Sequence, residues 1–226
     1  RDYYASRGLG DVYKRQLENY VTAFKRVDIG TAYVNSIVIS GAVTVVVMVL
    51  AGLAAYAMVR YSFRLRGFLH SMIIASMMFP VFSTLIPVFR MESSWGIVNT
   101  GSIWLTRLSV VLPQIAGNLS FAIIVLMGFI RSLPVDLEEA AYLEGYNVYQ
   151  IFFRIIMPLA KPSFATVGIF TFLWSYNDLF LQMFFLRSKK FFTITRLLNE
   201  ISSQAGTNYG LMVAAVVMLF LLVLQV

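Results

Sequence analysis

A short charged segment lies between two long apolar stretches of this sequence. It contains Glu139-Ala140-Ala141 and Gly145, and it closes with Ile156-Met157-Pro158. Carboxylates on a short helix in water can cap that helix or pair with a basic partner. Glu138 and Glu139 are adjacent and fan apart on a helix, which makes them poor partners for acid–base catalysis. The segment is therefore either a docking element for another protein or an ordinary capped loop helix.

Local signals predict two short helices within this segment. Asp136 is expected to be an N-cap, with Glu139 three residues later in a capping-box arrangement. Gly145 stands where a left-handed residue would end the first helix. Asn147 can begin a second helix, and Pro158 and Pro162 are expected to break the chain before the next apolar stretch.

Asp178 is a second candidate, because it is the one charged residue in the stretch 162–186. A carboxylate inside an apolar segment is by default a functional hypothesis. We expect Asn177 and Asp178 to line an outer vestibule and to hydrogen-bond a polyhydroxylated solute; the alternative is a cap or an ion pair at the end of a span. Pro80 and Pro87 either face the same pathway or only kink their helix.

The rest of the chain must place these residues within a membrane. Of its 226 residues 59% are hydrophobic and 13% are charged, and the mean hydropathy is +0.76. The charge-free stretches exceed the roughly 20 apolar residues that cross a hydrocarbon core as a helix. Backbone groups in lipid must be satisfied internally, so the sequence predicts an all-α polytopic transmembrane helical bundle. Five spans are expected, at about 33–59, 68–89, 109–130, 163–186 and from 210 to the end.

The ends of the chain have a different character. Residues 1–16 show no apolar period, no signal-peptide core and no helix-capping pattern, so we expect a non-native tail there. Residues 17–226 are expected to form one transmembrane domain.

Several kinds of chemistry are not encoded. The sequence has no G-x-x-x-x-G-K-[ST] phosphate loop, so it does not hydrolyse ATP by that route. It has no cysteine and one histidine, and we expect neither a metal site nor a cofactor. The net charge of +7 fits basic residues that flank membrane helices, and no basic soluble face predicts nucleic-acid binding. We expect no enzymatic activity.

The charged segment resembles the E-A-A…G signature of binding-protein-dependent ABC importer permeases. The family pattern runs E-A-A, three residues, G, about nine residues, then I-x-L-P. This chain differs mildly, because Glu144 stands where Asp is usual and Met157-Pro158 closes the motif one residue early. The flanks resemble the carbohydrate-importing branch, which includes maltose-type inner-membrane subunits. These flanks are Asn35-Ser36, Ala54-Ala55-Tyr56-Ala57, Ile86-Pro87, Gly96-Ile97-Val98-Asn99-Thr100 and 170–178.

The resemblance implies a multi-pass permease subunit of the bacterial inner membrane, with six spans in the intact subunit. It would move a sugar or oligosaccharide by alternating access. The implied partners are a dimer of ABC ATPase subunits, a second permease subunit and an extracytoplasmic solute-binding protein. The ATPase would grip the cytoplasmic loop 131–161 through Glu139, Ala140, Ala141, Gly145, Ile156 and Pro158.

Other readings remain at this point. The solute could be another small polar molecule, or the chain could be an ATP-independent secondary transporter or channel subunit, or a membrane scaffold or sensor. Counting charges does not settle the topology. In the family's orientation six basic residues lie in inner loops and eight in outer segments, which mildly opposes the positive-inside rule.

Overall fold

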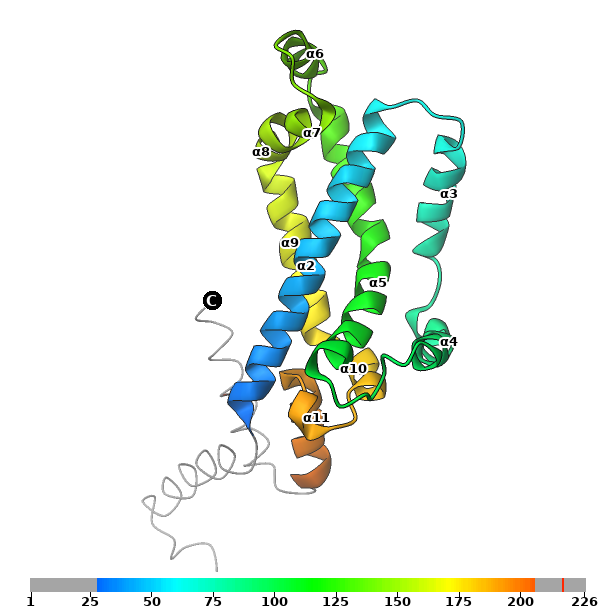
Figure 1. Cartoon of the computed structure of the whole chain (residues 1–226), viewed down its shortest axis with the longest axis vertical. Coiled ribbons are helices and arrows are strands. Elements are labelled where there is room, and N and C mark those ends of the chain that lie inside the picture. Colours follow the sequence, from blue (N-terminus) through cyan, green and yellow to red (C-terminus); the bar gives the residue numbers. More distant parts are fainter. Residues whose placement is uncertain (1–27, 206–216, 218–226) are drawn as a thin grey trace, which may run out of the picture.

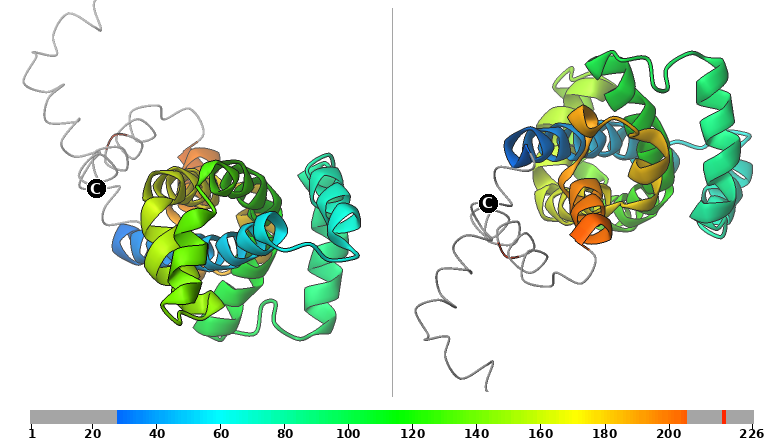
Figure 2. Two further views of the ribbon diagram at one scale, coloured as in Figure 1. Left: turned by 90° about the horizontal axis from the view of Figure 1, so that it is seen from above. Right: turned by 90° about the horizontal axis from the view of Figure 1, so that it is seen from below.

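Three long helices stand side by side and form the centre of the computed structural model, which describes residues 28–205 and residue 217 (Figures 1 and 2). They are α2 (Ile29–Arg60), α5 (Ile103–Ser132) and α9 (Lys161–Asn177), and α2 packs mainly on the other two. The predicted tail 1–16 and the predicted fifth span lie outside the described residues. Every regular element in the described part is helical, as the sequence predicts.

Small residues let α2 approach its neighbours closely. Its buried positions include Ser36, Ser40, Ala51 and Ala55, and Gly52 faces two aromatic rings of other elements. In lipid, helix association depends on such close packing, because the surrounding tails are as apolar as the side chains. The core continues through fully buried aliphatic side chains of all three helices, namely Val43, Val47, Leu126, Ile130 and Val167.

The outside of the bundle is strongly apolar. Large exposed side chains occur along α2 and α5 and are frequent on α3 (Arg66–Ser76) and α4 (Val81–Ser94). An apolar surface this extensive is unfavourable in water and suits a hydrocarbon surround. By length and composition α2 and α5 can each cross a membrane. The segments 148–159 and 161–177 are together long and apolar enough to cross a membrane, with a bend of 82° between them.

The predicted second span is not one helix. The sequence suggested a kinked helix over 68–89, but α3 ends at Ser76 and α4 begins at Val81, with Pro80 as its N-cap in an extended conformation. Pro80 has no N–H and disfavours helical geometry in the residue before it, so the chain breaks there. Pro87 stays inside α4. Figure 1 shows α4 almost end-on below the upright α3.

The predicted fourth span is also shorter than expected. α9 ends at Asn177, and Asp178 adopts an extended conformation before α10 (Phe180–Phe185). A 3₁₀ turn (Lys189–Phe191) and α11 (Ile194–Ala205) follow at the same end of the bundle. The elements of the 131–161 loop lie at the opposite end (Figure 1). They are α6 (Asp136–Leu143), α7 (Val148–Ile151), a π-helix (Phe152–Ile156) and α8 (Met157–Leu159).

Candidate functional site

The first helix of the 131–161 loop begins one residue earlier than predicted. Val135 is the N-cap and already has helical backbone angles, and its carbonyl accepts from the N–H groups of Glu138 and Glu139. Asp136 is the first helical residue, so the expectation that its side chain caps the helix is wrong. The fixed geometry of Pro134 allows the chain to enter the helix directly at Val135. The acidic residues of the first turn still lie at the positive end of the helix dipole, where negative charge is favourable.

The end of α6 follows the prediction. Gly145 has a φ of +87°, which is the left-handed conformation that glycine adopts without strain. Its N–H donates to the oxygen of Tyr142 at 3.0 Å, and the N–H of Tyr146 donates to the oxygen of Ala141 at 3.0 Å. These two bonds form a Schellman motif, which satisfies carbonyls at the helix end and fixes the direction of the chain.

The second half of the loop is also well defined. Asn147 accepts from the backbone N–H of Gln150, and the Gln150 side chain accepts in return from the Asn147 N–H, both at 2.9 Å. This capping box starts α7. Pro158 has no N–H to donate, and the preceding turns widen into a π-helix in which Met157 donates to the oxygen of Phe152. The 82° bend follows at once, so the loop joins α9 through a rigid elbow.

Glu138 is the functional candidate that sequence reasoning missed. It is 4% exposed, and both of its carboxylate oxygens are bound by side chains of α2. The Tyr56 hydroxyl donates to Oε2 at 2.8 Å, and Arg60 Nε donates to Oε1 at 2.6 Å. Arg60 also donates from its terminal nitrogen to the oxygen of Leu133 at 2.9 Å. Arg60 and Glu138 are 78 positions apart, so their spacing in the sequence does not predict that they form a pair.

The predicted docking residues divide into an exposed and a buried group. Glu139, Ala140, Gly145 and Pro158 are exposed, as is Leu143 at 91%. Ala141 and Ile156, in contrast, are buried within this chain. Ala141 faces inward on the same side of α6 as Glu138, so its side chain packs within this chain and does not lie on the exposed face. Further exposed apolar side chains on the loop are Leu137, Tyr142, Tyr149 and Phe153.

The second candidate region is a cleft of about 560 Å³ beside α5 and α9. Asn177 and Asp178 line it, so the structure brings these two predicted residues together. Gln114 donates to Asp178 Oδ2 at 3.0 Å, and the N–H of Leu181 donates to Asp178 Oδ1 at 3.2 Å. Asp178 thus ties α9, α10 and α5 together at the end of a span, and it also faces the cleft.

Sequence reasoning missed most of the cleft's polar lining. Gln114 and Asn118 lie on α5, and Ser175 on α9 donates to Gln114 Oε1 at 2.6 Å. The signal that could have found them is an uncharged amide within an apolar span. Two aromatic rings complete the lining, those of Phe121 and Trp174, whose centroids are 5.1 Å apart.

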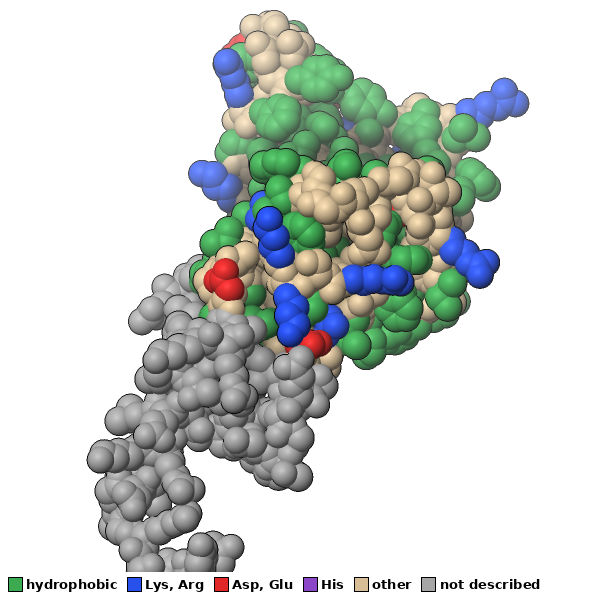
Figure 3. Space-filling view, turned by 60° about the horizontal axis from the view of Figure 1, so that its bottom comes forward, with side chains coloured by type: hydrophobic (Ala, Val, Ile, Leu, Met, Phe, Trp, Pro, Cys, Tyr) green, Lys and Arg blue, Asp and Glu red, His purple; other side chains and the backbone are tan. Residues whose placement is uncertain are grey.

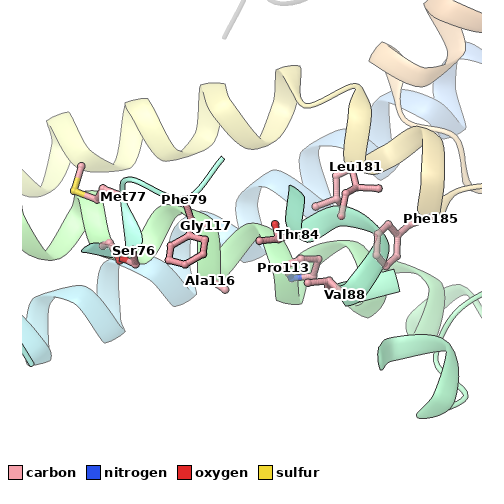
Figure 4. A pocket seen from close by; sticks show the side chains of 12 residues that line it. Ser76, Met77, Phe79, Thr84, Val88, Pro113, Ala116, Gly117, Leu181 and Phe185 are labelled. Atoms are coloured by element: carbon pink, nitrogen blue, oxygen red, sulfur yellow. The ribbon is translucent and has the colours of Figure 1, made fainter. Parts of the chain in front are cut away.

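A smaller hollow adjoins this cleft (Figure 4). It measures about 370 Å³ and lies between α5, α10 and the α3–α4 break. Met77, Pro113, Gly117 and Leu181 line both hollows, which therefore lie next to each other along α5. Pro80 and Pro87 line neither of them. In the described part of the chain, no three His, Asp or Glu side chains lie together so as to hold a metal ion.

The far end of the bundle is closed by a polar clamp and carries basic side chains. Asn35 on α2 binds Arg107 of α5 and main-chain oxygens of the segment before α11, and Ser36 accepts from the N–H of Ile194 at 2.9 Å. Arg187, Lys189 and Lys190 are exposed in this region. Figure 3, which brings this end forward, shows Lys and Arg side chains spread over the face with few acidic ones.

Comparisons with known proteins agree with this architecture. Residues 47–226 match the family described as "Binding-protein-dependent transport system inner membrane component". The chain is 32% identical, over 93% of its own length and 68% of the relative's, to the diacetylchitobiose uptake system permease protein of Streptomyces coelicolor. It is 30% identical to the melibiose/raffinose/stachyose import permease protein of Bacillus subtilis, over 90% of its own length and 72% of the relative's.

A solved structure shows the same fold. It is that of a bacterial ABC transporter involved in the import of the acidic polysaccharide alginate. The superposition has a TM-score of 0.77 and covers 92% of this chain and 75% of the other, at 23% sequence identity.

Proposed function

Because the chain belongs to the binding-protein-dependent transport system inner membrane component family, we propose that it imports a sugar or oligosaccharide as the permease subunit of an ATP-binding cassette transporter. It is a multi-pass membrane protein. Membership of this family does not favour the ATP-independent alternatives. The transport cycle would be driven by separate ATPase subunits.

The observation that carries the sugar assignment is the lining of the 560 Å³ cleft. Its volume falls within the roughly 300–1,000 Å³ of small-molecule sites. Trp174 and Phe121 supply aromatic surface against which the apolar side of a pyranose can pack, while the amides of Asn118 and Asn177 can bond its hydroxyl groups. The named substrates of two relatives, diacetylchitobiose and melibiose/raffinose/stachyose, are of the same class.

The exposed surface of the 131–161 loop supports an ATPase partner. The caps and the elbow hold α6 and α7 rigidly, and Leu143 and Tyr149 extend from them into the surroundings. Exposed apolar side chains on a rigid, otherwise charged loop are typical of an interface. We assign the acidic face with Glu139 and Ala140 to the same contact.

A second permease subunit is supported by α3, which has no buried residue. Its exposed side chains include Phe68, Met72 and Ile74, and α4 adds Phe82 and Ile86. A helix with so little burial inside its own chain needs another packing partner, either lipid or protein. The basic end of the bundle would receive the extracytoplasmic solute-binding protein.

The decisive experiment is uptake by the assembled transporter in proteoliposomes, with ATP inside and a loaded binding protein outside. We expect ATP-dependent uptake of an oligosaccharide, and Trp174→Ala should raise KM about tenfold because it removes one face of the site. The matched control is Trp95→Ala, an exposed tryptophan that does not line the cleft. Uptake of amino acids or ions but of no sugar would overturn the assignment.

A further inference from the structure

We infer that Arg60 and Glu138 form an internal joint that fixes the ATPase-docking helix α6 to the long helix α2. Glu138 is then a positioning residue, which holds the exposed face of α6 in register with the bundle without touching ATPase or solute. This inference rests on the proposed function, because it assigns a role to the link between the docking loop and the pathway.

The joint carries much of the attachment of α6 to its own chain. Of the eight residues of α6 only Glu138 and Ala141 are buried. The carbonyl of Ala141 accepts a hydrogen bond from the N–H of Tyr146, but Tyr146 belongs to the same loop and not to the bundle. A further link to the end of α2 is a hydrogen bond between the hydroxyls of Tyr61 and Tyr142 at 3.0 Å. The position of α6 on the bundle therefore depends on directional polar contacts more than on apolar packing.

The geometry of the joint fixes orientation as well as distance. Arg60 binds the carboxylate of Glu138 through Nε and the carbonyl of Leu133 through its terminal nitrogen. One planar guanidinium thus binds both α6 and the residue Leu133, which lies just before that helix. Tyr56 occupies the second carboxylate oxygen of Glu138. Charge-assisted bonds of this kind have a narrow preferred geometry, whereas an apolar contact would tolerate sliding.

The other end of α2 is also tied down. The side chain of Asn35 binds a main-chain oxygen of the segment before α11, and that of Ser36 binds the first N–H of α11. A helix of 32 residues is about 48 Å long at 1.5 Å per residue. α2 therefore connects the docking loop directly to the opposite end of the bundle. A displacement of α6 by its partner is passed to α2 through Arg60, and a loose attachment would absorb it.

The test uses the assembled transporter in proteoliposomes. Uptake and ATP hydrolysis are both measured per assembled complex, and their ratio gives the solute moved per ATP. Glu138→Gln and Arg60→Gln should each lower this ratio about tenfold while the ATPase stays bound. Tyr56→Phe removes one hydroxyl and keeps the ring, so it should lower the ratio about threefold. The control is Arg64→Gln, an exposed basic residue four positions beyond Arg60 and outside the docking loop.

A charge exchange separates the joint from a plain folding contact. Arg60→Glu combined with Glu138→Arg should restore at least half of the ratio that each single charge reversal loses. If the single variants reduce only the amount of assembled complex and leave the ratio at the wild-type value, the joint is overturned. An exchange variant no better than the single reversals overturns the pairing. Failure of the wild-type complex to show ATP-dependent uptake would instead refute the proposed function.

Discussion

The side-chain amide of Asn35 donates to the main-chain oxygen of Phe192 at 3.1 Å, across 157 positions of the sequence. The same amide accepts from Arg107 at 2.8 Å and donates to the oxygen of Lys190 at 3.3 Å. Asn35 is 1% exposed, so these bonds form away from water. One side chain of α2 thus joins α5 and the segment before α11 at this end of the bundle.

Replacing Asn35 by Ala should loosen this end. The guanidinium of Arg107 and two carbonyls would lose a buried partner, and each such loss costs about 1–3 kcal/mol. We expect a lower thermal unfolding midpoint in detergent and faster trypsin cleavage after Lys189 and Lys190. Asn35→Asp keeps an acceptor for Arg107 and should recover part of the stability. Unchanged cleavage in the Ala variant would show that the clamp does not hold this segment.

Gly52 marks the closest approach between α2 and its neighbours. A Cβ atom there would lie 2.8 Å from Cζ of Phe164 and 3.0 Å from Cζ of Phe152. Gly52→Ala should therefore destabilise the bundle by about 1–3 kcal/mol, as overpacking typically does. Gly41→Ala is the matched control on the same helix, because its Cβ would meet nothing within 4 Å. Thermal unfolding of the two variants side by side checks the difference, and equal midpoints would contradict it.

Gly145 is needed for its backbone conformation and not for space. Its φ is +87°, yet an added Cβ would contact nothing within 4 Å. Gly145→Ala should cost about 1–2 kcal/mol through left-handed strain alone, and Gly145→Asn should cost less because Asn tolerates this region. Thermal unfolding measures the order Gly, Asn, Ala. Gly128→Ala, at an open helical position, should show no loss.

Leu143 offers a test of docking without a folding cost, since its side chain is almost fully exposed. Leu143→Asp should reduce co-purification of the ATPase at least about tenfold if this side chain fills a pocket of the partner. The control is Leu65→Asp. Leu65 is also exposed and follows the end of α2 that carries Arg60, but it lies outside the 131–161 loop, so this variant should retain the ATPase. Equal retention by both variants would place the docking surface elsewhere.

Asp178 can be tested as a solute contact. Asp178→Asn keeps an acceptor for the N–H of Leu181 but loses the charge that faces Gln114 and the cleft. We expect KM for uptake to rise about threefold to tenfold, the equivalent of one polar contact. Asp136→Asn, an exposed change in the 131–161 loop, serves as the control. An unchanged KM and rate would leave Asp178 as a cap at the end of a span.

Sequence reasoning succeeded where one residue determines the local structure. The glycine that ends α6 and the cap at Asn147 follow from backbone chemistry that neighbouring residues do not alter. The break expected at Pro158 comes two residues later, because the helix runs through Pro158 to Leu159 and the chain bends at Ala160. The number of helices does not follow from the sequence in the same way, because a proline can either bend a helix or end it. Around Pro80 the helix ends, since α3 stops at Ser76 and α4 begins only at Val81.

The pairings of the site were beyond a single sequence. Glu138 and Glu139 are both acidic residues of one turn, and only the rotation of α6 against Arg60 determines which of them is buried. That rotation depends on a contact between residues 78 positions apart. The amide of Gln114 is likewise oriented by a residue far away in the sequence, because Ser175 of α9 donates to its oxygen beside the cleft.

The tight contact at Gly52 has a consequence for the kind of motion that α2 can make. One residue of a helix corresponds to a turn of about 100°. A turn of that size would replace Gly52 by Ala51 or Leu53 against the ring of Phe164, where even one added carbon collides. Rotation of α2 about its own axis is therefore blocked in the half of the helix that ends at Arg60. The movements left to it are tilting and translation together with the helices that hold it.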